Sequence, residues 1–175
     1  MLKEMQGRIR SMALLHETLY RTGNFARVDL AEYLRQLGSQ LFRGQNTDAS
    51  RIRLEFDLSA ALVDIDQAIP CGLIVNELLT NCLKYAFADG REGAVHVGLL
   101  CEPGGRLRLC VNDSGPGLPK DFEARRDRSL GLQLVSDLAR QLAGVLEIGT
   151  GPGASFTVAF TPHASPIEEG AGTQA

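Results

Sequence analysis

Residues 76–87 read Asn-Glu-Leu-Leu-Thr-Asn-Cys-Leu-Lys-Tyr-Ala-Phe and close a long helical pattern that begins near Asp66. Apolar residues recur along this pattern at helical spacing, which predicts a helix packed on a core. Glu77, Asn81 and Lys84 stand at i, i+4 and i+7, so they share one face. Because the neighbouring positions are apolar almost all round, we expect this polar stripe to line a cleft rather than to face solvent.

The three side chains of the stripe suit a site for magnesium and phosphate. The amide oxygen of Asn81 is a hard ligand of the kind that Mg²⁺ takes together with water and phosphate oxygens. The Lys84 ammonium adds positive charge. The carboxylate of Glu77 can hold a metal-bound water or accept a proton. The sequence therefore predicts a magnesium and phosphate site on a core helix.

Strand patterns surround this helix. Apolar residues alternate with charged ones over residues 52–58, which predicts a half-buried strand, and further strands are expected over 94–101, 106–112, 145–148 and 155–161. Ser129 can cap a helix from Leu130 to Ala143, which Gly144 is expected to end in the left-handed conformation. The mixed order of elements, with the last four strands in two adjacent pairs, predicts an α+β fold built as a two-layer sandwich.

A second motif, Asp113-Ser-Gly-Pro-Gly, follows the predicted strand 106–112. Gly115 and Gly117 allow the backbone to turn sharply and to approach a ligand closely. The Asp113 carboxylate can accept a hydrogen bond from an exocyclic amino group. Guanine would present a carbonyl there and leave a buried acid unpaired. Asp113 is thus a candidate for selecting adenine.

A third motif is the start of the helix predicted from Leu130. Its free N–H groups and dipole favour an anion close to Gly131. The segment before it is basic and suited to closing over phosphates, through Lys120, Arg125, Arg126 and Arg128. We expect this helix start to face the phosphates.

The first 45 residues have a different pattern. Apolar positions spaced 3-4-3-4-3, with His16 among them, predict a helix that packs against other helices and comes from a longer hairpin or dimer. Asp29 and Glu32 form a capping box before a second amphipathic helix. We expect these residues to be a helical unit separate from the sandwich, and residues after Pro162 to be a disordered tail.

Composition excludes several classes of protein. The formal charge of -3 leaves no basic excess for binding nucleic acid. The four cysteines have no metal-site spacing and are expected to be free thiols, mostly buried, in a reducing compartment. No apolar run reaches the roughly 20 residues of a membrane span, so we expect a cytoplasmic location. P-loop and protein-kinase signatures are absent.

Four motifs, taken in order along the chain, resemble the catalytic domain of sensor histidine kinases. This domain belongs to the GHKL superfamily, which includes DNA gyrase, Hsp90 and MutL. The motifs are residues 76–87, the Asp113 motif, residues 129–135 and Gly151-Pro-Gly-Ala-Ser-Phe. The resemblance spans about residues 50–161 and implies a Bergerat-type fold that binds ATP and Mg²⁺. It departs at Ser129, where the second glycine motif usually has glycine, and at Ala154-Ser155, where the last motif usually reads Gly-Thr.

The resemblance also implies roles for individual residues. Asn81 would coordinate Mg²⁺, Glu77 would be the acidic catalytic residue, and Asp113 would read the adenine amino group. Gly131 and Leu132 would form a lid hinge. The nucleotide contacts that it implies come from Asn81, Lys84, Tyr85, Asp113, Gly115, Gly117, Gly131 and Leu132.

Residues 8–20 are similar to the second helix of the dimerisation and phosphoacceptor hairpin in kinases related to bacterial light and stress sensors. In that subfamily the phosphorylated histidine lies on the first helix, in a His-Arg-x-Lys-Asn type motif that this sequence lacks. The resemblance therefore gives His16 a packing role and implies a homodimer and a response regulator as partners. It divides the chain into a dimerisation remnant (1–45), a catalytic domain (46–162) and a tail (163–175).

Three functions are compatible with these residues. The leading hypothesis is a histidine kinase fragment that transfers the γ-phosphoryl group of ATP to a histidine on a helix outside this chain. A GHKL ATPase would instead use Glu77 to activate water. A nonenzymatic scaffold or phosphotransfer protein with a decayed nucleotide pocket is the third.

Overall fold

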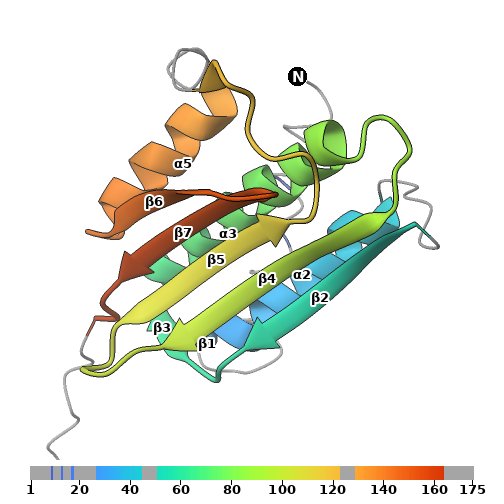
Figure 1. The fold of residues 1–175 in the computed structure, drawn as a ribbon. Helices are drawn as coiled ribbons and strands as arrows, with labels where there is room; N and C mark the ends of the chain where they lie inside the picture. The colour runs from blue at the N-terminus through green and yellow to red at the C-terminus, as the bar shows by residue number, and fades with distance from the viewer. Residues whose placement is uncertain are drawn as a thin grey trace, which may run out of the picture.

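The computed structural model describes residues 27–44, 51–122 and 129–163, together with Ile9, Ala13 and Glu17, which are helical. Its main element is a five-stranded sheet, shown in Figure 1. The strands lie in the order β2 (Ile52–Leu58), β4 (Gly93–Cys101), β5 (Leu107–Asp113), β7 (Ala154–Phe160) and β6 (Val145–Thr150). The five strands predicted from the sequence are confirmed within two residues at each end.

Short connections explain part of the strand order. The pairs β4–β5 and β6–β7 are antiparallel neighbours in sequence and in space, while β2 pairs with β4 in parallel. Residues of alternating positions point into the core, among them Val97, Leu109 and Val158. The mixed sheet and the helices described next confirm the predicted α+β sandwich.

Within the described part of the chain, three helices cover one face of this sheet (Figure 1). They are α2 (Leu30–Gly44), α3 (Ile65–Asn81) and α5 (Leu130–Gln141). Helix α3 lies between the other two, packs on both, and is buried along most of its length. The helix that carries the polar stripe is thus the central element of the helical layer.

Helix α3 continues into a π-helical segment, Cys82–Ala86. The sequence predicted the whole helical run to about Phe87 but not this change of geometry. A π-helical turn holds more residues than an α-helical one and therefore rotates the side chains that follow it. Lys84 consequently does not continue the line from Glu77 to Asn81 that ideal helical spacing predicts.

Helix α2 begins as the capping pattern predicts, because the N–H of Glu32 donates to Oδ1 of Asp29 at 3.1 Å. Its apolar face, which includes Tyr33, Leu34 and Leu37, is buried in the same core as α3 and the sheet. The sequence suggested a separate unit for these residues, but the described helix packs on α3 and β2. The division of the chain at residue 45 stays a prediction.

Two short strands were not predicted. β1 (Arg27–Asp29) pairs antiparallel with β3 (Leu62–Asp64), so the chain entering α2 lies beside the chain entering α3. Three-residue strands are too short to show alternation of apolar and polar positions. Their pairing joins the starts of two helices that are 35 residues apart in sequence.

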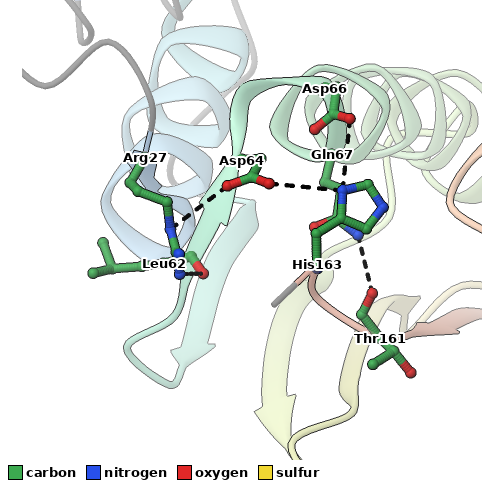
Figure 2. A network of polar contacts seen from close by, with 7 residues as sticks. All are labelled: Arg27, Leu62, Asp64, Asp66, Gln67, Thr161 and His163. Carbon is green, nitrogen blue, oxygen red and sulfur yellow. Dashed lines mark hydrogen bonds and ion pairs between the residues drawn. The ribbon is translucent and has the colours of Figure 1, made fainter. Parts of the chain in front are cut away.

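A polar network fixes this corner of the molecule to the end of β7 (Figure 2). Nε of Arg27 lies 3.7 Å from Oδ1 of Asp64, whose Oδ2 lies 3.7 Å from Nδ1 of His163. Oδ2 of Asp66 lies 3.6 Å from the same nitrogen. The buried Gln67 amide donates to the Thr161 carbonyl at 3.0 Å and accepts from the His163 N–H at 2.9 Å. The chain leaving β7 is therefore held against the start of α3.

The end of α5 corrects one expectation. The left-handed residue is Ala143, with φ of 50°, and not Gly144. The N–H of Gly144 donates to the Ala139 carbonyl, and that of Ala143 to Arg140, as in a Schellman motif. A Cβ on Gly144 would lie 2.8 Å from the Ala159 carbonyl oxygen. Gly144 is thus needed for its small size, while Ala143 takes the strained conformation.

Candidate functional site

The polar stripe of α3 meets the start of α5. Glu77 is only 5% exposed and stands one turn before Asn81. A Cβ built on Gly131, the second residue of α5, would lie 3.1 Å from Oε2 of Glu77 and 4.0 Å from Nδ2 of Asn81. A carboxylate, an amide and a helix N-terminus thus converge from segments about 50 residues apart.

The first turn of α5 is formed as the sequence predicts. Ser129 is its N-cap, and its hydroxyl accepts a hydrogen bond from the Leu132 N–H at 3.4 Å. The serine that departs from the family pattern therefore has a structural role here. Leu132 is buried in the core, whereas Leu130 is 77% exposed. Gly131 lies between an anchored residue and an exposed one.

Asp113 ends strand β5, and hydrogen bonds within its own motif fix its side chain. Oδ1 accepts from the Gly115 N–H at 2.8 Å and from the Ala154 N–H at 3.3 Å. A Cβ on Gly115 would lie 2.6 Å from that of Ala86, so the motif packs against the π-helical segment. Gly117 adopts φ of 82°, a left-handed turn that favours glycine.

The turn between β6 and β7 completes the surroundings of Asp113. A Cβ on Gly153 would lie 1.7 Å from the Asp113 carbonyl oxygen, so only glycine fits there. Ala154 follows and donates to Oδ1 of Asp113. The hydroxyl of Ser155 donates to Oδ1 of Asn112 at 2.7 Å. The Ala-Ser pair that departs from the family pattern is thus bonded directly to the end of β5.

Lys84 and Tyr85 are exposed at the far end of the helical run. The Lys84 ammonium lies 5.1 Å from the centre of the Tyr85 ring, close enough for a cation–π contact. They lie on the π-helical segment, beyond Asn81. Their contacts with a nucleotide stay predictions.

Of the basic residues expected to close over phosphates, Lys120 is described and exposed. Arg125, Arg126 and Arg128 lie outside the described residues, as does His16. The sequence alone did not select two residues near Asp113: Ala154, whose N–H donates to its carboxylate, and Cys82, whose pKa is raised by burial and then by the charge of Asp113. The position of Cys82 directly after Asn81 was the available signal.

The arrangement has two chemically different ends. At one end, the Asn81 amide, the Glu77 carboxylate and the N-terminus of α5 offer an oxygen ligand for a hard cation and N–H groups for an anion. At the other, Asp113 offers a fixed carboxylate to a hydrogen-bond donor. Cys82 follows Asn81 in sequence, and burial and then the charge of Asp113 raise the pKa of its thiol. A ligand with an amino-bearing base and phosphates matches both.

Comparison with known families agrees with this geometry. Residues 66–165 match the family described as histidine kinase-, DNA gyrase B-, and HSP90-like ATPase. Residues 1–45 match a second family, described as histidine kinase. No helix within the described parts of the chain is long and apolar enough to cross a membrane.

Individual proteins give the same assignment. The chain is 28% identical over 148 residues to blue-light-activated histidine kinase 2 of Erythrobacter litoralis, covering 82% of this chain and 42% of that protein. The histidine kinase domain of the E. litoralis EL346 blue-light activated kinase superimposes with a TM-score of 0.82 at 26% identity, over 91% of this chain and 75% of that one.

A third comparison is with full-length ShkA in complex with AMPPNP, which has a TM-score of 0.63 at 26% identity, over 82% of this chain and 33% of that one. The chain spans less than half the length of blue-light-activated histidine kinase 2. The family matches cover both the N-terminal helical segment and the sandwich. The chain therefore belongs to the sensor histidine kinases, and residues 66–165 form their ATP-binding catalytic domain.

Proposed function

We propose that this chain binds Mg-ATP between α3, the Asp113 motif and the start of α5, and transfers the γ-phosphoryl group to a histidine outside these 175 residues. The phosphoryl group would then pass to a response regulator. The observation that carries the proposal is the convergence of Glu77 and Asn81 with the N-terminus of α5 at Gly131. Burial of the Glu77 carboxylate on a core helix costs free energy, and packing of the helix does not require it.

The base of the nucleotide would bind at Asp113. Its carboxylate accepts two backbone hydrogen bonds through Oδ1, which fix its orientation. Oδ2 would accept a hydrogen bond from the adenine amino group, while Gly115 and Gly117 would let the base approach the backbone. An oxygen-bearing base such as hypoxanthine or guanine offers no donor there, which supports selection of adenine.

The residues at the other end fit a magnesium ion. An amide oxygen and a carboxylate are oxygen donors of the type that Mg²⁺ prefers, and phosphates would supply further oxygens. Asn81 would hold the ion, which would neutralise phosphate charge when bound. Glu77 would orient a coordinated water and accept a proton.

The phosphates would lie at the start of α5. Its first N–H groups and dipole favour negative charge, and Gly131 allows close approach of the backbone. Leu132 would anchor a lid hinge there, and Lys84 and Tyr85 would contact phosphate and nucleoside. Catalysis of this kind consists mostly of positioning and charge stabilisation. We further propose that the whole protein dimerises through its N-terminal helices and acts in the cytoplasm.

Calorimetric titration with ADP and with a nonhydrolysable ATP analogue, with and without Mg²⁺, tests this proposal. We expect magnesium-dependent binding by the chain, and its loss in Asn81→Ala and Asp113→Ala. Asp57→Ala, which removes an exposed carboxylate of β2, is the matched control and should bind as the unaltered chain does. Absence of binding by the folded chain would contradict the proposal and favour the scaffold.

A measurement of ATP hydrolysis by the same chain distinguishes a kinase from an ATPase. Hydrolysis of ATP by the chain alone, abolished in Glu77→Gln, would support an ATPase in which Glu77 activates water. Binding without such hydrolysis is the result that the kinase proposal expects, because its acceptor histidine is on another helix.

A further inference from the structure

Strand β2 forms one edge of the five-stranded sheet (Figure 1). Among the strands of the described chain, it pairs with β4 alone, and the pairing is parallel. The Arg51 carbonyl accepts from the Gly93 N–H at 2.9 Å, so the backbone groups of the odd-numbered residues of β2 point to β4. Those of the even-numbered residues, from Ile52 to Leu58, point the other way. They form the row of donors and acceptors by which an edge strand can pair with a further strand.

The apolar side chains of β2 are incompletely covered. Leu54 and Phe56 face α2, since a Cβ on Gly38 would lie 3.5 Å from the first and 2.9 Å from the second. Together with Ile52 they are half-buried, whereas Val95, which lies directly opposite Leu54 on β4, is fully buried. A further strand beside β2 would therefore remove more apolar surface from water.

The charges on the other face of β2 are complementary to those of a second β2. Arg53 and Glu55 alternate with the apolar residues and are exposed. When a second copy of the strand lies antiparallel, with Leu54 opposite Leu54, Arg53 of each copy lies opposite Glu55 of the other. At the ends of the strand, Arg51 of each copy lies opposite Asp57 of the other. Every charge on this face of β2 then lies opposite a charge of the other sign.

The residue pattern selects this register over its neighbours. A shift of one residue would place the apolar face of one strand beside the charged face of the other. A shift of two residues would place Arg53 opposite Arg53 in one direction and Glu55 opposite Glu55 in the other, and like charges directly opposite are destabilising. In the register centred on Leu54, Ile52 also lies opposite Phe56. The backbone groups that point outward then meet as pairs joined by two hydrogen bonds each.

We propose that the free edge of β2 pairs with β2 of a second copy of this chain, antiparallel and centred on Leu54, so that the two sheets become continuous. Helix α2 packs on β2, whereas α5 contacts β6 at the opposite edge. Pairing at β2 therefore leaves the start of α5 and the candidate nucleotide site open, and nucleotide binding is independent of it. The contact is separate from the N-terminal helices and does not rest on the proposed function.

Exchange of charges tests this pairing. Arg53→Glu places like charges opposite each other twice in a pair of identical chains, and so does Glu55→Arg. An equimolar mixture of the two variants restores opposite charges at both places, as does the double variant Arg53→Glu/Glu55→Arg. The two side chains are 75% and 52% exposed, so the variants should fold, which circular dichroism checks. Glu147→Arg, the same change on β6 at the other edge of the sheet, is the matched control.

Two measurements follow the association. Sedimentation velocity over a series of concentrations gives the dissociation constant of the pair. Hydrogen exchange by NMR reports on this edge alone, even where chains also associate through other segments. As the concentration rises, we expect the Leu54 and Phe56 amides, which point outward, to become protected. The Arg53 and Glu55 amides, which point to β4, should be protected at every concentration.

We expect each single variant to weaken the pairing by about tenfold or more, because two favourable cross-strand pairs become two unfavourable ones. The mixture and the double variant should restore the dissociation constant to within about threefold of the unaltered chain. Glu147→Arg should leave it within the same range. Protection of the Leu54 amide should follow the dissociation constant in every case.

Four results would overturn the inference. Outward amides that stay unprotected up to about 1 mM chain would mean that this edge does not pair. Protection of them at every concentration would mean that another segment of the same chain covers the edge. Failure of the mixture to restore pairing would mean that Arg53 does not lie opposite Glu55. Equal weakening in Glu147→Arg would mean that overall charge, and not this register, controls association.

Discussion

Gly131 lies so close to Glu77 that a Cβ on the glycine would be 3.1 Å from Oε2 of the glutamate. The two residues belong to α5 and α3, which pack against each other in the helical layer. The absence of a side chain at Gly131 therefore sets how closely the N-terminus of α5 approaches the buried carboxylate. Under the proposed function, this close approach brings the first N–H groups of α5 to the phosphates.

Gly131→Ala tests the importance of that distance. The new methyl group would displace the Glu77 carboxylate, and we expect nucleotide binding to weaken about tenfold, or about 1.4 kcal/mol. Stability should change little, since alanine favours the helix by about 1 kcal/mol over glycine and offsets the close contact. Calorimetry and urea unfolding measure the two effects separately. Gln141→Ala, on the exposed end of α5, is the control, and unchanged binding in Gly131→Ala would contradict the expectation.

Gly153→Ala is expected to be severe. Its Cβ would lie 1.7 Å from the Asp113 carbonyl oxygen, a backbone atom that cannot move without displacing β5. We expect a loss of about 3 kcal/mol in the free energy of unfolding, measured in urea. Gly104→Ala is the comparison, because it has φ of 84° but open space around it. That variant should lose only about 1 kcal/mol, from backbone strain alone.

Adjacent residues at the end of α5 should respond in opposite ways. Ala143→Gly relieves the left-handed strain and is expected to stabilise the fold by about 0.5 to 1 kcal/mol. Gly144→Ala brings a Cβ within 2.8 Å of the Ala159 carbonyl oxygen and should cost about 2 kcal/mol. Thermal unfolding of both variants measures these changes. If both variants were stabilised, or both destabilised, the end of α5 would differ from the one described.

The Gln67 amide should hold the chain that leaves β7. Gln67→Ala removes hydrogen bonds to Thr161 and His163, and we expect a loss of about 2 kcal/mol. Hydrogen exchange at the His163 amide should accelerate at the same time. Asp66→Asn, which weakens the exposed contact with the His163 ring and removes a charge from the first turn of α3, should stay within about 1 kcal/mol of the unaltered chain and leave the exchange unchanged. Unchanged exchange in Gln67→Ala would contradict this role of the Gln67 amide.

The four cysteines should react with thiol reagents in a fixed order. Burial raises the pKa of Cys71, Cys82 and Cys110, which lowers their thiolate fraction at any given pH, whereas Cys101 is exposed. At pH 8 we expect Cys101 to react first, Cys110 slowly, and Cys71 and Cys82 only after unfolding. Mass spectrometry identifies the sites, and Cys101→Ser should remove the fast phase. Rapid modification of Cys82 in the folded chain would contradict its burial.

The sequence predicted those elements whose own residues determine both their type and their ends. Strand β2 has seven residues of strict alternation from Ile52 to Leu58, and its bounds were predicted correctly. Ser129 was identified as an N-cap because serine at that position supplies the missing acceptor. In contrast, the apolar stripe of α2 shows that one face is buried but not which element covers it.

Features that depend on distant contacts could not be predicted. Ala143 has the left-handed conformation, and Gly144 lies so close to Ala159 on β7 that it has no room for a side chain; no local pattern reports this approach. The π-helical segment that begins at Cys82 changes the direction of Lys84 and places Ala86 against Gly115, 29 residues later in the chain. Glu77, Asn81 and Asp113 were selected from the sequence, and their roles toward a nucleotide stay predictions.

The pairing of β1 with β3 has a mechanical consequence. The chain enters at Arg27, whose partner Asp64 directly precedes α3. A displacement of the chain at residue 27 would therefore act on Asp64 and the start of α3 through this short ribbon. The other end of α3 is Asn81, roughly 25 Å away at 1.5 Å per residue. A stiff rod thus joins the point where the chain enters the sandwich to the candidate nucleotide site.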